Sequence, residues 1–538
     1  MAGNRRVVSQ LESGKPGQGR DARSVRLRTR GNRFRRVTVA LVLGTLWVSV
    51  CFMHAAAHSI LKSSQPKAGS VVDESPDHIE LVFNEPVELA FGAIEVSGPD
   101  GQRYEAGEAE HPEGREDIVT VALGEGLPNG GYLVRWRIIA ADGHPRAGKF
   151  RFRLNAPVIA SPSPTAAASP GDVEEGHGAA QAPEEDPQHA IEEATRPAEI
   201  LLGVTRWFLF AGLLLLTGVF AFFAAVWLRP KRSFGQRPPQ VEEVFARRTN
   251  TILRIAWRTA FVATLVSLPL QASVAAGVGL GDISGSTVWE TLGTRFGAVA
   301  LVRLGLLVAV ALAWPWVRRA VGLHPGAPMR VPVPASVGAA AVSRRPLWPL
   351  VVGTPIAAAL LLTIGLAGHA GTLPPVALNL GADLVHLLGV AVWLGGLIGL
   401  VLLAFPATRG TSETDRVGLL APVVSRFSDF ALVAVAVIVG SGVLRGYLEI
   451  RSIDELTGSS YGLTLLVKLA AFLPLVALGA INNRWTKPRI ERAAAAGAPS
   501  PQLSTLRRLV TVEIALGVLI LGITAALVAL PPPIGTHV

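Results

Sequence analysis

Eight long apolar stretches lie between residues 199 and 538, and short polar segments separate them. Each stretch can form a helix that crosses a hydrocarbon core of ~30 Å at ~1.5 Å per residue. Only 17% of the residues are charged, against about 25% in a soluble domain. The sequence therefore predicts an all-α polytopic membrane domain over residues 199–538. The predicted spans are 200–228, 252–278, 297–317, 348–368, 380–405, 428–446, 462–481 and 509–530.

Arginine and lysine gather in alternate loops between these stretches. The loops after the first, third, fifth and seventh stretch are basic, whereas the other loops and the C-terminal tail carry few basic residues. Because cytoplasmic loops hold the excess of basic residues, residue 199 and the C-terminus are expected outside the cytoplasm. We thus expect a multi-pass protein of the plasma membrane, embedded in its lipid bilayer. The net charge of +10 follows from this topology and predicts no nucleic-acid partner.

A basic segment and then an apolar one begin the chain. Residues 1–36 are rich in arginine, residues 37–52 are apolar, and three alanines end at Ala57. This order is typical of a signal peptide, here residues 1–57. Cleavage after Ala57 puts alanine at both positions that must be small, and it makes His58 the mature N-terminus. An uncleaved membrane anchor is the alternative interpretation.

Residues 58–154 show short alternating segments typical of β-strands. The alternation covers 79–83, 94–96, 118–123, 132–138 and 150–154, with a Gly-Pro-Asp-Gly turn at 98–101. Strands at this spacing predict an all-β sandwich. Residues 155–198 are rich in proline, alanine, serine and acid. This composition cannot bury enough apolar surface to fold, so it predicts a disordered linker.

The β-domain resembles the CopC family of periplasmic copper-binding proteins. The motifs that carry the resemblance run in order along the domain: His58, 64–69 (SQPKAG), 81–87 (LVFNEPV), 131–136 (GYLVRW), 141–145 (ADGHP) and 148–152 (GKFRF). The resemblance implies a cupredoxin-like Greek-key sandwich. It also implies a Cu(II) site in which His58, through its amine and imidazole, Asp142 and His144 bind the metal. Glu85 is a candidate to contact one of these ligands.

The chemistry of this ligand set suits Cu(II), which favours nitrogen and oxygen donors in a tetragonal arrangement. The amine must lose a proton to bind, so affinity should fall in acid. Residues 58–154 contain no methionine, so the methionine-rich Cu(I) site of some CopC proteins should be missing. Without the family pattern, Asp142-Gly143 and His144 would equally suit an ordinary turn.

Polar residues within the predicted spans are candidates for a second metal site. Asp383 and His386 lie three residues apart, on one helical face of the fifth span. His369 ends the fourth span, and all three residues are expected in the outer half of the membrane. A carboxylate and two imidazoles can hold copper below the β-domain. The structural alternative is interhelical hydrogen bonding, or an ion pair of Asp383 with Lys468 or Arg303.

The membrane half is similar to the CopD copper-resistance membrane proteins. The similar segments are 368–370 (GHA), 383–386 (DLVH), 391–397 (AVWLGGL), 426–428 (RFS) and 466–469 (LVKL). A CopC domain joined to a CopD domain resembles the YcnJ-type copper-uptake proteins. That resemblance implies copper import across the plasma membrane.

Three functions are consistent with the sequence. The first is transport, in which the β-domain captures Cu(II) and delivers it to His369, Asp383 and His386. The second is a copper-binding, resistance or sensing protein that moves no copper, and the third is a redox protein with haem on His369 and His386. The chain contains no GxxxxGK[ST] phosphate loop and no catalytic constellation, so no enzyme is predicted. With Cys51 as the only cysteine, a copper reductase or chaperone would be a separate partner protein.

Overall fold

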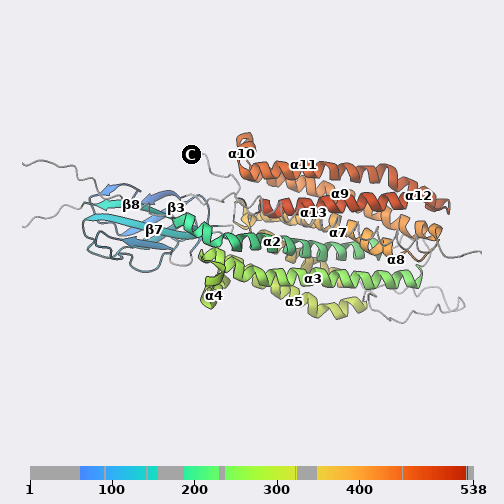
Figure 1. Ribbon diagram of the computed structural model, residues 1–538, viewed down its shortest axis with the longest axis horizontal. Coiled ribbons are helices and arrows are strands. Elements are labelled where there is room, and N and C mark those ends of the chain that lie inside the picture. Colours follow the sequence, from blue (N-terminus) through green and yellow to red (C-terminus); the bar gives the residue numbers. More distant parts are fainter. Residues whose placement is uncertain are drawn as a thin grey trace, which may run out of the picture.

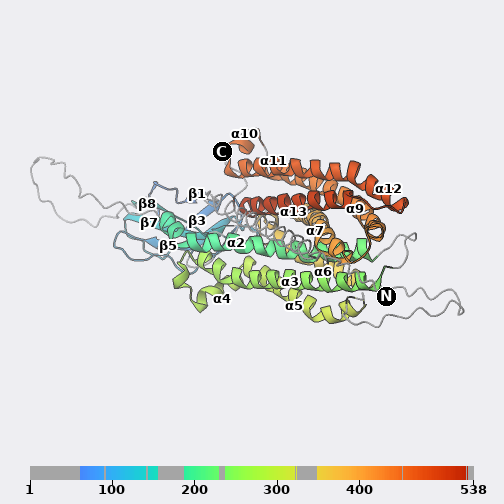
Figure 2. The ribbon, with the colours of Figure 1, turned by 45° about the vertical axis from the view of Figure 1, so that its right-hand side comes forward.

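The protein consists of a β-domain at one end of an elongated bundle of helices (Figure 1). The computed structural model describes residues 61–89, 93–140, 143, 145–155, 187–228, 237–320, 323, 348–372, 374–450, 452–528 and 530. The predicted signal segment 1–57 lies outside the described residues. The same arrangement of domain and bundle is visible after a turn of 45° (Figure 2).

Eight strands form the two sheets of the β-domain. The three-stranded sheet has the order β1-β3-β6, and the other sheet has the order β2-β8-β7-β4, with β5 paired to β7. The strands are β1 (Leu61–Gln65), β2 (Val71–Val72), β3 (His78–Phe83), β4 (Val87–Glu88), β5 (Ile94–Ser97), β6 (Ile118–Ala122), β7 (Gly130–Ala140) and β8 (Pro145–Leu154). Two facing sheets confirm the predicted sandwich, and each predicted strand coincides with one of them.

The core of the sandwich lies between the two sheets. Tyr132 of β7 stacks on Phe152 of β8 with ring centroids 5.1 Å apart, and Phe83 of β3 meets the edge of Trp136 at 5.4 Å. Along β3 and β5, buried side chains alternate with partly buried ones, as a sheet with one face in the core requires. The prediction missed β1, β2 and β4, because β1 is mostly polar and the other two are too short to alternate.

Long helices run side by side along the bundle. They are α2 (Pro187–Ala221), α3 (Pro239–Ala276), α5 (Arg295–Ala320), α6 (Trp348–Leu366), α7 (Val376–Ile398), α9 (Glu413–Glu449), α11 (Ser460–Ile481) and α13 (Gln502–Leu527). Shorter helices connect them: α4 (Gly285–Gly293), α8 (Phe405–Ala407), α10 (Ile453–Gly458) and α12 (Lys487–Ala495). Turns of 3₁₀ helix lie at η3 (Leu280–Asp282) and η4 (His369–Gly371), and π-helical turns at η2 (Phe222–Trp227), η5 (Gly399–Ala404) and η6 (Asn482–Thr486).

Seven of these helices, with their π-helical extensions, are long and apolar enough to cross a membrane. The helix at the fourth predicted span, α6, is shorter, with 19 residues or about 28 Å. Several helices begin before the predicted spans, since hydropathy marks the apolar stretch whereas backbone hydrogen bonds continue into polar flanks. The number of crossings therefore stays a prediction.

The helix α2 begins within the predicted linker. It starts at Pro187, so residues 187–198 are helical, whereas residues 156–186 lie outside the described residues. Proline suits the first turn of a helix, because the backbone N–H that it lacks would have no partner within the helix there. The alanine and glutamate that follow favour a helix. The ordered part of the connection thus reaches the β-domain directly.

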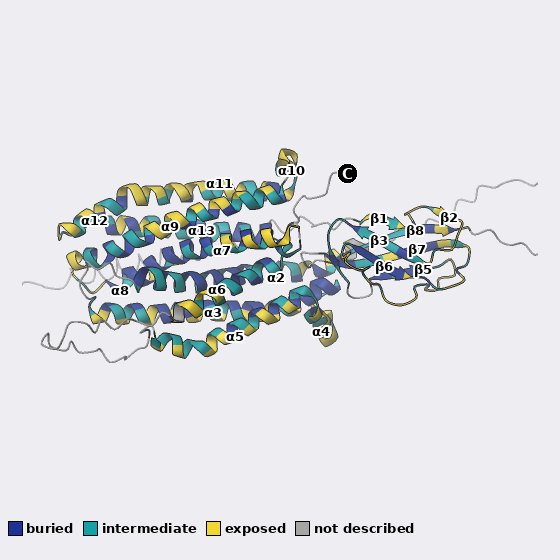
Figure 3. Ribbon diagram, turned by 180° about the vertical axis from the view of Figure 1, so that it is seen from behind, coloured by how far each residue is buried: buried dark blue, intermediate teal, exposed yellow. Residues whose placement is uncertain are grey.

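The helix α7 is the centre of the bundle, and glycine lets its neighbours approach closely. A Cβ atom on Gly395 would collide with the backbone of Gly218 on α2, so the two helices touch through their backbones, as is common in membranes. In the helix Val376–Ala407, which begins with α7, 67% of the most apolar segment is buried inside the protein. In the helix Ser460–Ala495, which begins with α11, only 11% is buried. The exposed face of α11 is visible in Figure 3, and in a bilayer it would face lipid.

Candidate functional site

The motif Asp142-Gly143-His144 occupies the hairpin between β7 and β8. Gly143 is described, whereas His58, Asp142 and His144 lie outside the described residues. The backbone N–H of Gly143 donates to the carbonyl of Ala140 at 2.8 Å, and its φ angle is +83°. Glycine adopts this left-handed conformation at little cost, which explains why the turn has glycine at its centre.

Gly143 also contacts the helical bundle. Its carbonyl accepts a hydrogen bond of 2.5 Å from Nε2 of Gln271, near the end of α3. A Cβ atom at Gly143 would lie only 2.7 Å from the same nitrogen. Gln271 is 1% exposed. The turn that carries two predicted copper ligands is therefore held against the end of a membrane helix.

Charged side chains also join the two domains, among them Arg146 on β8, which lies 4.0 Å from Glu192 on α2. Nη2 of Arg137 on β7 donates to the carbonyl of Ala275 at 2.9 Å, and burial lowers the pKa of the Arg137 guanidinium. Glu88 on β4 accepts from the backbone N–H of Arg295 at 3.2 Å, and its carboxylate lies 3.7 Å from Nε of the same arginine. The β-domain is thus docked on the ends of α2, α3 and α5.

A small hollow lies between the domains. Glu88, Ile139 and Gly143 line it from the β-domain, and Gln271, Ala275, Thr294, Arg295, Phe296 and Ala367 line it from the helices. Ala367 precedes Gly368 and His369 in the chain. The hollow therefore lies between Gly143, in the predicted copper motif, and Ala367, two residues before His369.

His369 begins the turn η4 between α6 and α7. Both of its ring nitrogens are buried, and neither has a hydrogen-bond partner among the residues that the structure describes. Buried polar atoms are normally paired. An unpaired imidazole in this position has a lone pair available for a metal ion.

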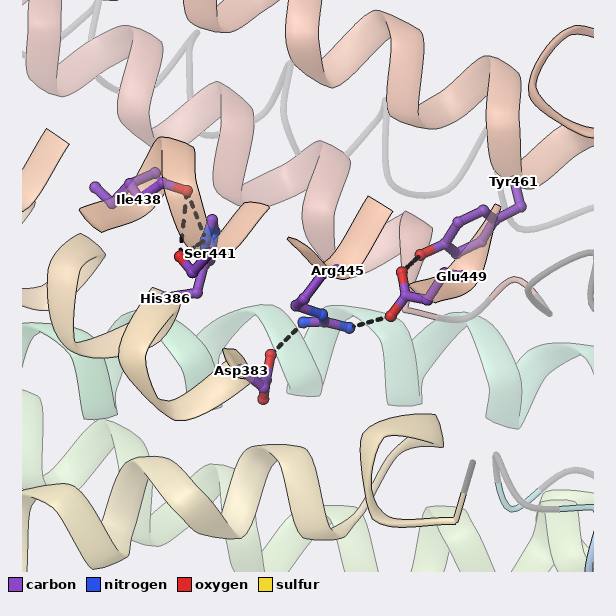
Figure 4. Close-up of polar contacts among 7 residues, drawn as sticks. All are labelled: Asp383, His386, Ile438, Ser441, Arg445, Glu449 and Tyr461. Carbon is purple, nitrogen blue, oxygen red and sulfur yellow. Dashed lines mark hydrogen bonds and ion pairs between the residues drawn. The ribbon is translucent and has the colours of Figure 1, made fainter. Parts of the chain in front are cut away.

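Asp383 lies on α7 and forms an ion pair with Arg445 of α9 (Figure 4). The guanidinium of Arg445 also contacts Glu449 at 2.6 Å, and Glu449 accepts a hydrogen bond from Tyr461 of α11. The sequence-based alternative correctly expected an ion pair but named Lys468 or Arg303 as the partner. Arg445 is the partner because α9 packs along α7 and brings its side chain to the level of Asp383.

Arg303 makes a different interhelical contact. Its Nε donates to the hydroxyl of Thr363 at 2.8 Å, and its Nη2 donates to the carbonyl of the same residue at 2.7 Å. Arg303 therefore joins α5 to α6.

His386 lies one turn beyond Asp383 on α7. Its Nδ1 is 3.2 Å from the carbonyl oxygen of Ile438 and 3.1 Å from the hydroxyl of Ser441. A carbonyl can only accept, so Nδ1 carries the proton and Nε2 keeps a lone pair. His386 is thus oriented by α9 with one nitrogen available as a ligand (Figure 4).

The three membrane candidates do not form one compact metal site. Within the described ranges, no group of three or more His, Cys, Asp and Glu side chains is close enough to hold a metal ion. His369, Asp383 and His386 are therefore separate positions, the first in the turn η4 and the other two on α7. Glu85 lies in the described turn between β3 and β4 and is half-buried.

Sequence reasoning missed Gln271, Glu449 and Tyr461. Gln271 is a polar residue within an apolar span, which was the available signal. Glu449 lies four residues after Arg445, a spacing typical of a helical ion pair. No local sequence pattern indicates Tyr461, because its contact with Glu449 depends on how α9 and α11 pack together.

Three family models match parts of the chain. The CopC domain model matches residues 61–155, the model of the N-terminal domain of copper resistance protein D-like proteins matches residues 197–331, and the model of copper resistance protein D matches residues 421–527. The matches cover the β-domain and both parts of the helical bundle.

Individual relatives give the same result. The chain is 28% identical over 484 residues to the copper transport protein CutJ of Bacillus subtilis, covering 89% of this chain and 75% of that protein. It is 32% identical to copper resistance protein C of Escherichia coli, over 21% of this chain and 94% of that protein. It is 33% identical to copper resistance protein D of Pseudomonas syringae pv. tomato, over 29% of this chain and 49% of that protein.

A solved structure similar to the β-domain is CopC from Methylosinus trichosporium OB3b. It is 29% identical and covers 18% of this chain and 95% of that chain, with a TM-score of 0.17.

Proposed function

Since the chain belongs to the CopC family through its β-domain and carries CopD family matches in its helices, we propose that it takes up copper across the plasma membrane. In this proposal the β-domain captures Cu(II) outside the cell and passes it to the membrane half. The observation that carries the proposal is the hydrogen bond from Gln271 to Gly143, because it joins the copper motif to the mouth of the bundle.

The capture step uses the N-terminal His58 together with Asp142 and His144. The amine and the three side chains offer the nitrogen and oxygen donors that Cu(II) prefers. The proposal requires cleavage after Ala57, since an uncleaved chain has no free amine at His58. It also places the β-domain and the C-terminus outside the cytoplasm.

The sidedness is supported by the distribution of charge along the bundle. The helix α12 lies at the end opposite the β-domain (Figure 1) and carries Lys487, Arg489 and Arg492. Basic residues mark the cytoplasmic side of membrane proteins. The β-domain then lies outside.

The transfer step leads from the hollow between the domains into the membrane. The ion leaves the β-domain beside Gly143, passes Ala367 and meets the unpaired imidazole of His369. His386 can receive it next through Nε2. Asp383 is less available as a ligand, because its Oδ1 is paired with the guanidinium of Arg445 in this structure.

Copper uptake into vesicles tests the proposal. Purified full-length protein is reconstituted, Cu(II) is added outside, and a copper-sensitive dye reports copper inside. We expect uptake above that of protein-free vesicles and a strong loss in His369→Ala, which removes an imidazole with no structural hydrogen bond in the described residues. Binding without uptake would contradict transport and favour the copper-binding or sensing function.

A further inference from the structure

Glu513 is a buried carboxylate in the half of the bundle away from the β-domain. Its exposed fraction is 3%. Along α13 it lies about 16 Å from the first residue, Gln502, and about 21 Å from the last residue, Leu527. The end of α13 at Leu527 is the one near the β-domain. The other buried carboxylates among the described residues of the bundle, Asp383, Glu449 and Glu455, all lie toward the β-domain. Burying an acidic side chain at this depth in a membrane costs free energy, so such residues are rare and often line ion pathways.

Asn482 supplies a second oxygen beside this carboxylate. Its Nδ2 donates to Oε1 of Glu513, and its Oδ1 is buried with no hydrogen-bond partner in the described part of the chain. Asn482 begins the π-helical turn η6 that ends α11, and such turns are frequent at functional sites. The pair therefore combines a carboxylate with an unpaired amide oxygen.

A tryptophan separates this pair from the outer candidates. Trp393 lies two turns beyond His386 on α7 and is 7% exposed. It packs on Gly517, where a Cβ atom would lie 3.5 Å from the indole ring. Gly517 is one turn from Glu513 on the same face of α13. The order along the bundle is thus His386, Trp393 and then Glu513.

We propose that Glu513 and Asn482 form an inner station that receives the copper ion after it passes Trp393. This inference rests on the proposed transport function and names where the ion goes after His386. In the structure the indole of Trp393 packs beside Gly517, so this proposal requires Trp393 to move off Gly517 before the ion reaches the inner station.

The ligand atoms indicate the oxidation state of the ion. Methionine occurs only at Met1, Met53 and Met329, and cysteine only at Cys51, so residues 330–538 contain neither. Cu(I) prefers thiolate and thioether ligands, whereas nitrogen and oxygen donors suit Cu(II). A path through His369, His386, Asn482 and Glu513 therefore carries Cu(II).

The vesicle assay with full-length Glu513→Gln tests this station. Glutamine keeps the volume of the side chain and can still accept from Asn482, but it removes the charge. We expect the initial rate of Cu(II) uptake to fall by about tenfold or more, with copper binding by the β-domain unchanged. Glu413→Gln is the matched control, because it removes one exposed carboxylate at the start of α9 and should leave uptake at the wild-type rate.

Three further measurements keep the test decisive if Glu513→Gln is poorly folded. Asn482→Ala removes the amide oxygen and keeps the carboxylate, so it should also slow uptake, whereas Glu513→Asp should restore part of the rate. Ag(I), which resembles Cu(I), should not compete with Cu(II). Wild-type uptake with equal rates in Glu513→Gln and Asn482→Ala would overturn the inner station alone, and a wild-type protein without uptake would overturn transport as well.

Discussion

The two ends of the helical bundle differ in what they bury. Toward the β-domain, Asp383, Arg445 and Glu449 form a charged chain in the interior. At the opposite end, Trp227 stacks on Phe245 with ring centroids 3.6 Å apart, within a large apolar cluster. In the proposed transport, a cation from the β-domain would meet these polar groups first, and the apolar cluster at the opposite end would have to rearrange before the ion left.

The charged chain also explains why the polar end can be stable. Removing a charge from water costs several kcal/mol, and only a well-placed counter-charge offsets that cost. The guanidinium of Arg445 donates hydrogen bonds to two carboxylates at once: Nη1 donates to Asp383 and Nη2 donates to Glu449. The polar end is thus paired where it holds α7, α9 and α11 together, whereas the imidazole of His369 has no hydrogen-bond partner among the described residues.

Replacing Arg445 should break this contrast most strongly. Arg445→Gln removes the cation that contacts both Asp383 and Glu449 and leaves only the electrostatic interaction with Lys468 to offset their charge. The free energy of unfolding should therefore fall by about 3–5 kcal/mol. Thermal or denaturant unfolding of the detergent-solubilised protein measures the change.

The control for this substitution is Arg445→Lys, which keeps the charge but cannot contact both carboxylates with a planar fork. It should lose less stability than Arg445→Gln. Wild-type stability in both variants would show that the charged chain does not hold the polar end together.

The fold of the two halves could largely be predicted from the sequence, because each half depends on a local pattern. The alternation at 79–83 and 132–138 predicts β3 and β7, and long apolar stretches predict the membrane helices. The start of α2 at Pro187 could not be predicted by the same reasoning. Its first twelve residues are too polar to register as a span, yet they form a helix next to the β-domain.

The candidate sites were predictable only in part. Asp383 stood out as a charge within a span, but its partner Arg445 is 62 residues away. No local spacing encodes that distance, since it depends on how α7 and α9 pack. The contact between Gly143 and Gln271 spans 128 residues and two domains, so it too becomes visible only in the folded chain.

Loss of a copper ligand should have the next largest effect and would identify the β-domain end as the point of entry. His144→Ala should weaken Cu(II) binding by more than about 100-fold, since a direct ligand contributes more than the groups around it. Isothermal titration of the full chain measures the affinity. His78→Ala is the matched control, because the side chain of His78, at the start of β3, forms a hydrogen bond only with the neighbouring Asp77 among the described residues. This variant should leave the affinity unchanged.

The pH dependence of the same binding tests the ligand at His58. Its amine has a reference pKa of about 8, so the apparent affinity should fall by about tenfold per pH unit below that value, with the imidazoles adding to the loss below about 6.5. A flat affinity between pH 7 and 8 would contradict amine ligation and cleavage after Ala57.

The smallest predicted effect concerns how the β-domain is held on the polar end. Gly143→Ala places a side chain in left-handed backbone and 2.7 Å from Nε2 of Gln271, so docking should weaken by about 1–2 kcal/mol. Gly69→Ala is a sharp control, because Gly69 has a φ of +76° with nothing within 4 Å of an added Cβ atom. Both variants carry the backbone cost, but only Gly143→Ala collides with the helices.

Protease accessibility of the interface between the domains separates the two costs. Cleavage of the full chain should accelerate in Gly143→Ala and not in Gly69→Ala. Gln271→Ala added to Gly143→Ala should relieve the collision without restoring the hydrogen bond between the domains, so cleavage should stay fast. If Gly69→Ala and Gly143→Ala behave alike, the hydrogen bond to Gln271 does not hold the motif over the bundle. The polar end would then receive its ion from a mobile β-domain, and the contrast between the two ends would lie within the membrane half alone.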